Sequence, residues 1–109
     1  MKTVTFNMRA FASTSHGSRV NALLAKHDIS AEQMMVAIHA EVLEVLPGLI
    51  AGGRYLTEHL CGPELWERFG TVGVRRCAGM CLAYLAEIRA VPLVIATAPG
   101  AYPLKFSLR

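Results

Sequence analysis

Charged residues are scarce in this 109-residue chain: Asp, Glu, Lys and Arg make up 17% of it, whereas hydrophobic residues make up 53%. So little charge leaves a small domain short of polar surface, which favours the burial of apolar surface against a second copy or another partner. No apolar run reaches the roughly 18–20 residues that a membrane span needs, because acidic and helix-ending residues interrupt the longest candidate, residues 34–50. The sequence therefore predicts one soluble domain with no membrane partner.

Cysteines and targeting signals are scarce as well. The three cysteines, Cys61, Cys77 and Cys81, are an odd number and lack the spacing of a disulfide scaffold. The N-terminus lacks the basic region, apolar stretch and small-residue cleavage site of a secretory signal. We therefore expect a reducing, cytoplasmic setting.

Catalytic and cofactor motifs are missing too. None of the four histidines has a serine, a cysteine or an acid at a recognisable catalytic spacing. The glycine pair at 52–53 lacks the strand–glycine–helix pattern of a phosphate-binding loop and indicates the end of a helix. We therefore expect no enzymatic activity and no cofactor.

A metal site is the one chemical alternative that the sequence offers. Cys77 and Cys81 lie four residues apart on one face of a predicted helix, and Cys61 and His59 would be the further ligands. The pair falls on the apolar face of that helix, however, where a buried cysteine packs as a small hydrophobic residue. We favour packing and expect no metal.

In the first half, the apolar pattern predicts one strand and two helices. Residues 2–10 alternate between apolar and polar side chains, which is the period of a half-buried strand. A short helix is predicted over 17–27 and a longer one over 30–50. Ser30, followed three residues later by Gln33, forms a capping box at the start of the longer helix.

In the second half, helices and strands follow one another at short intervals. Thr57 and Thr71 are predicted to cap helices, and Pro63 suits the first position of another. The expected order is a strand at 54–56, a single turn at 58–60, a helix at 63–69, a helix at 71–89, and a hairpin of strands 92–97 and 102–108.

Charge is divided unevenly along the chain. Residues 68–109 carry six Lys or Arg and one acid, Glu87, whereas residues 1–67 carry five Lys or Arg and seven acids. A basic C-terminal segment on a mildly acidic body is typical of a polyanion-binding face. Ordinary solubilising charge gives the same distribution, and the sequence leaves both interpretations open.

The second half resembles the winged helix-turn-helix family in element order and apolar pattern. The segments that carry the resemblance are RYLTEHLCGPELWERFG, TVGVRRCAGMCLAYLAEIRA and VPLVIATAPGAYPLKFSLR, about half of the chain. The resemblance implies a small, mostly helical α+β single domain. Residues 1–53 would supply an N-terminal strand and helices for possible dimerisation, and residues 54–109 the winged-helix-like part.

The resemblance also implies a mode of binding to double-stranded DNA, with the helix over 71–89 as the recognition helix. Gly79 and Ala83 are small and would let this helix approach a groove closely. The hairpin tip at 97–102, which would be the wing, has no charge. The recognition face has few Asn, Gln and Lys, so phosphate contacts should outweigh base readout. Trp66 is either a base-stacking platform or a core anchor. The expected nucleic-acid contacts come from Thr71, Arg75, Arg76, Gly79, Lys105 and Arg109.

These features predict a regulator of transcription, of a size that fits a phage, a plasmid or another mobile element. We expect a homodimer, formed through residues 30–50 or through the N-terminal strand. The alternative is a protein-binding adaptor or inhibitor that uses the uncharged wing. The N-terminal half also resembles a ribbon-helix-helix arrangement, in which Thr3, Thr5, Asn7 and Arg9 would face a DNA groove.

Overall fold

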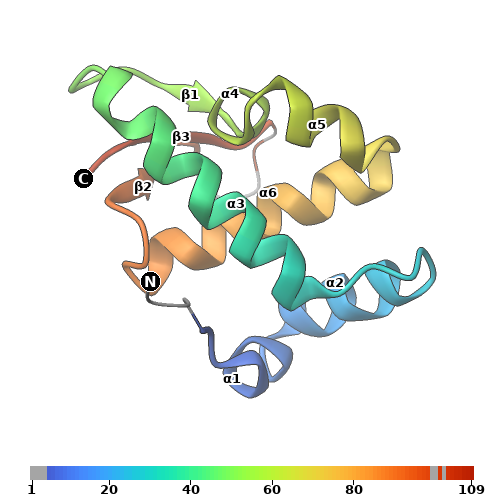
Figure 1. The fold of residues 1–109 in the computed structure, drawn as a ribbon. Coiled ribbons are helices and arrows are strands. Elements are labelled where there is room, and N and C mark those ends of the chain that lie inside the picture. The colour runs from blue at the N-terminus through green and yellow to red at the C-terminus, as the bar shows by residue number, and fades with distance from the viewer. Residues whose placement is uncertain (1–4, 99–100, 102) are drawn as a thin grey trace.

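The computed structural model describes residues 5–98, 101 and 103–109, and the fold is a small α+β arrangement of helices with a three-stranded sheet at one side (Figure 1). The elements in chain order are α1 (Met8–Ala12), α2 (Ser15–Ala25), α3 (Ala31–Val45), the 3₁₀ turn η1 (Leu46–Gly48), β1 (Tyr55–Leu56), α4 (Thr57–Cys61), α5 (Pro63–Phe69), α6 (Val72–Glu87), β2 (Leu93–Ile95) and β3 (Lys105–Leu108).

The predicted N-terminal strand is wrong where the structure describes it, because Met8–Ala12 forms the helix α1. The side chain of Asn7 accepts a hydrogen bond from the backbone N–H of Ala10 at 3.0 Å, so this residue caps the helix. The helical turn places Phe11 in the core, 1% exposed, against the ring of Tyr84. A ribbon-helix-helix strand is therefore not formed over Thr5–Arg9, and Thr3 lies outside the described residues.

The junction of α1 and α2 is unusually close. Thr14 caps α2 by accepting a hydrogen bond from the N–H of Gly17 at 2.9 Å. A Cβ atom at position 17 would lie 2.6 Å from the carbonyl carbon of Phe11, which is backbone and cannot move aside. Glycine is therefore required where the first turn of α2 presses against the end of α1.

Ser30 caps α3 as predicted, because its hydroxyl accepts a hydrogen bond from the N–H of Gln33 at 3.3 Å. The helix is shorter than the predicted 30–50: α3 ends at Val45, and the 3₁₀ turn η1 follows. Pro47 accounts for the early end, because a proline inside a helix removes a backbone donor and clashes with the preceding turn.

The helices of the second half follow their predicted bounds closely. α5 spans Pro63–Phe69, and Thr71 caps α6 by accepting a hydrogen bond from the N–H of Val74 at 3.2 Å. The predicted capping role of Thr57 is wrong. Thr57 is the first residue of α4 and is buried, while Leu56 occupies the cap position without a side-chain hydrogen bond.

The predicted hairpin is confirmed, with strands shorter than expected. β2 and β3 pair antiparallel, with Ile95 opposite Phe106, and β1 joins the other edge of β3 with Tyr55 opposite Phe106. The sheet order is therefore β1-β3-β2, and β3 is the central strand. Phe106 is fully buried at the middle of the sheet.

The core is built around α6, which packs against α2, α3, α4, α5 and β2 (Figure 1). Its buried residues are Val74, Cys77, Ala78, Gly79, Cys81, Leu82, Leu85 and Ala86. Within the described residues, no helix has the length and apolar character needed to cross a membrane.

Candidate nucleic-acid interface

One narrow stripe of α6 faces solvent. It begins with Val72, which is 70% exposed, and continues through the exposed Arg76 one turn later. Met80 and Ala83 follow and are half-buried, and the exposed Glu87 ends the helix. The stripe therefore has a cation near its N-terminal end, an apolar middle and an acid at its C-terminal end.

Arg75 is turned away from this stripe and ties α6 to α5. Its Nε and Nη2 atoms donate hydrogen bonds to the carbonyl oxygen of Trp66 at 3.2 and 3.1 Å. That carbonyl belongs to the last turn of α5, where carbonyls have no partner within the helix and favour a cation. The guanidinium also lies 5.0 Å from the centre of the Trp66 ring, a cation–π distance. Arg75 thus stabilises the angle between the two helices.

Gly79 does not lie on the solvent face of α6, so the expectation that it opens the helix to a groove is wrong. Gly79 is buried. A Cβ atom there would meet Thr57 Oγ1 at 3.4 Å and Leu104 at 3.9 Å. The small residue instead allows α4 and the hairpin to approach α6.

The predicted hairpin cations have different surroundings. Lys105 is exposed and lies opposite Leu56 in the sheet. The guanidinium of Arg109 donates to the carbonyl oxygens of Ala86 at 3.1 Å and Leu93 at 3.3 Å. Arg109 therefore links the C-terminal end of α6 to β2 by hydrogen bonds, which stabilises the fold. Of the four predicted cations, Arg76 and Lys105 are the two with no such backbone contact among the described residues.

A shallow hollow of about 370 Å³ lies beside the N-terminal half of α6. It brings together Arg76 and the exposed apolar side chains of Val72 and Leu56. Its lining comes from β1, α4, α5, α6 and the hairpin: Leu56, Thr57, Glu58, Trp66, Val72, Arg75, Arg76, Gly79, Pro103 and Leu104. Trp66 is half-buried here and is covered by Arg75, so its ring is engaged within the protein.

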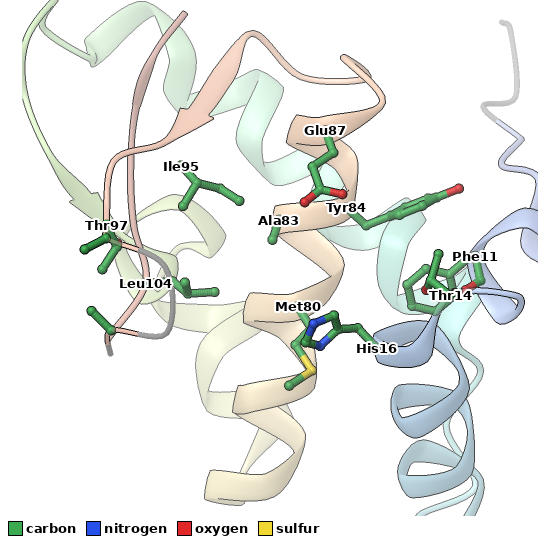
Figure 2. Close-up of a pocket in the computed structure, with 12 residues that line it drawn as sticks. Phe11, Thr14, His16, Met80, Ala83, Tyr84, Glu87, Ile95, Thr97 and Leu104 are labelled. Carbon is green, nitrogen blue, oxygen red and sulfur yellow. Dashed lines mark hydrogen bonds between the residues drawn. The ribbon is translucent and has the colours of Figure 1, made fainter.

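A larger cleft of about 810 Å³ lies beside the second half of α6, between the hairpin and the α1–α2 junction (Figure 2). Its lining is mostly apolar and aromatic: Phe11, Thr14, His16, Met80, Ala83, Tyr84, Glu87, Ile95, Thr97, Ala98, Ala101 and Leu104. Leu104 borders both depressions. We call the first depression the hollow and the second the cleft.

The three cysteines are buried in the core. Burial raises the pKa of the Cys61 and Cys81 thiols to about 12 and also raises the pKa of Cys77. The Cys81 thiol donates to Met34 Sδ at 3.8 Å. Among the described residues, no group of three or more His, Cys, Asp and Glu is placed to hold a metal ion. These thiols pack as hydrophobic side chains and are poor nucleophiles.

Sequence reasoning missed the cleft, and the reason is the misassigned N-terminus. One wall depends on Phe11 and His16, which come together with Tyr84 only because α1 is a helix. No motif marks this set, since its members are far apart in the chain. Comparison with known protein families, with curated proteins and with solved structures gave no match.

Proposed function

We propose that this protein binds double-stranded DNA through the N-terminal half of α6, as a small regulator of transcription. The observation that carries the proposal is the exposure of Val72 and Arg76 at the start of α6, a helix whose other side is packed into the core. A helix start presented to solvent after a preceding helix and tight turn is the arrangement by which helix-turn-helix proteins reach base edges and phosphates.

The topology supports the proposal. From β1 to β3 the order is a short strand, helices α4 and α5, helix α6 and a two-stranded hairpin, with β3 central in the sheet. This order agrees with what the resemblance to the winged helix-turn-helix family implies. Arg75 fixes α5 against α6, so the start of α6 is held in one orientation.

The charges define which contacts carry the binding. Arg75 and Arg109 are bound to backbone carbonyls, so Arg76 and Lys105 are the proposed phosphate ligands. Lys105 lies beside the hollow, because it is paired with Leu56, which lines it. Two available cations imply weak binding, and the lack of Asn, Gln and Lys on α6 implies that phosphate contacts dominate it.

Arg76→Ala and Lys105→Ala should each weaken binding to duplex DNA, and the double variant should weaken it further. Each lost phosphate contact flattens the slope of log affinity against log salt by about 0.9. The measurement is fluorescence anisotropy of a labelled duplex over a range of salt concentrations. Arg89→Asn is the matched control, because Arg89 lies about 20 Å from Arg76 along the α6 axis and its positive φ is tolerated by Asn.

An absence of duplex binding at low salt would contradict the proposal and favour the second candidate, a protein-binding adaptor or inhibitor. The observation that supports this candidate is the apolar surface beside Arg76: Val72 is 70% exposed and Leu56 is 38% exposed. An apolar contact is insensitive to salt, so the salt slope separates the two functions.

We further propose a homodimer formed through the outer face of α3. Val36 and Leu43 lie seven residues apart on α3 and are 39% and 47% exposed. A stripe of this kind can pair with its own copy about a two-fold axis. The N-terminal strand is not formed over the described residues and is no longer a candidate for the contact.

Leu43→Glu should raise the dimer dissociation constant by at least about tenfold, because an unpaired charge would be buried at the contact. Light scattering at several protein concentrations measures the change. Val72→Glu introduces the same charge on α6 and should leave the dimer intact. A wild-type protein that stays monomeric at high concentration would rule the dimer out.

A further inference from the structure

We propose that the cleft binds a small organic cation with an apolar body, such as an aromatic amine. This inference is independent of the proposed function, because the cleft lies beside the second half of α6 and the proposed DNA contacts lie beside the first half and Lys105. Small-ligand pockets commonly measure about 300–1,000 Å³ and are mostly apolar with a few polar groups. The cleft, at about 810 Å³, has this size and composition.

The shape of the cleft favours a compact ligand. Figure 2 shows Met80 and Ala83 of α6 at its floor, Ile95 and Leu104 on the hairpin side, and Phe11 on the opposite side. Five lining residues are packed in or against the hydrophobic core, which leaves part of the site preformed: Phe11, Met80, Ala83, Tyr84 and Leu104. A preformed site reduces the ordering cost of binding.

The charge of the cleft selects the sign of the ligand. Glu87 is the only acid among its described lining residues, His16 is the only basic side chain, and no Lys or Arg is among them. Its carboxylate lies beside the ring of Tyr84 in Figure 2. Tyr84 packs edge-on against Phe11, with ring centres 4.9 Å apart and an interplanar angle of 67°. A carboxylate next to an aromatic face is a favourable environment for an ammonium or aromatic cation.

Two fluorescent probes of similar size and opposite charge test the inference in the absence of DNA. The cationic dye thioflavin T should bind with saturation at one site per chain, and anilinonaphthalene sulfonate, an anion, should bind more weakly. Glu87→Gln should weaken thioflavin T binding by about three- to fivefold, the range of a partly exposed ion pair. The same substitution should leave the affinity for the anionic probe unchanged or higher.

A second substitution tests the location. Ala83→Phe fills the floor of the cleft and should abolish saturable binding of the cationic dye. Ala22→Phe adds the same ring to the exposed face of α2, outside the cleft and the hollow, and should leave binding unchanged. Thermal unfolding monitored by circular dichroism establishes that each variant is folded. The inference fails if the wild type does not bind the cationic dye, if Glu87→Gln binds it equally well, or if a folded Ala83→Phe still binds it.

Discussion

Replacing Phe106 by alanine is expected to lower the free energy of unfolding by about 3–5 kcal/mol. Phe106 is fully buried on the central strand, where it lies opposite both Tyr55 of β1 and Ile95 of β2. Removal of its ring would leave a cavity between the sheet and the helices, and the cost includes lost contacts as well as lost apolar burial. Small domains are stable by about 5–15 kcal/mol, so the variant would be close to unfolding.

Urea unfolding followed by circular dichroism measures this effect. Phe6→Ala is the matched control, because Phe6 is only half-buried and packs at the margin of the core. The control should lose about 1 kcal/mol or less, which is the cost of partial burial. Equal losses at the two positions would contradict the central role of β3 in the core.

The protein is expected to lose stability steeply between pH 9 and pH 12. Burial raises the pKa of Cys61 and Cys81 from an ordinary value of 9.0 to about 12, and both side chains are fully buried. Above pH 9 the unfolded chain releases these protons while the folded chain retains them. Folding then has to take up protons, so the stability present below pH 9 is lost as the pH rises toward the folded-state pKa. The slope is about 1.4 kcal/mol per pH unit for each thiol.

The comparison that isolates the thiols is Cys61→Ala/Cys81→Ala against wild type, with urea unfolding at each pH. The double variant is expected to be less stable at pH 8, because it loses buried volume. The difference in unfolding free energy between wild type and the double variant should shrink as the pH rises, because the variant has no thiols at these positions to ionise. Parallel stability curves for the two proteins would show that the thiols do not cause the alkaline loss.

Local signals predicted the second half of the chain well. Pro63 and Thr71 act through the backbone within a few residues of themselves, so their effects are visible in sequence. The N-terminal strand was wrong because the alternation of residues 2–10 did not reveal the capping of Met8–Ala12 by Asn7. Capping and the burial of Phe11 outweigh the two-residue period there.

The candidate site was harder to predict, because tertiary contacts decide which side chains are free. Arg75 and Arg76 are neighbours in sequence, but only Arg75 reaches the carbonyl of Trp66. Gly79 lies on the polar side of the helix in the sequence pattern, yet α4 and the hairpin cover it. The one-sided apolar pattern of a helix identifies the face that packs against its largest neighbour. It does not show which other elements cover the remaining faces of the helix.

The position of β3 between β1 and β2 has a consequence for synthesis on the ribosome. Neither outer strand pairs with the other, so both remain without a partner until the last strand in chain order has left the exit tunnel. A nascent chain that ends before Lys105 can form helices but no sheet. The long-range pairing of β1 with β3 therefore becomes a late step, and the edges of β1 and β2 stay exposed until β3 has been synthesised.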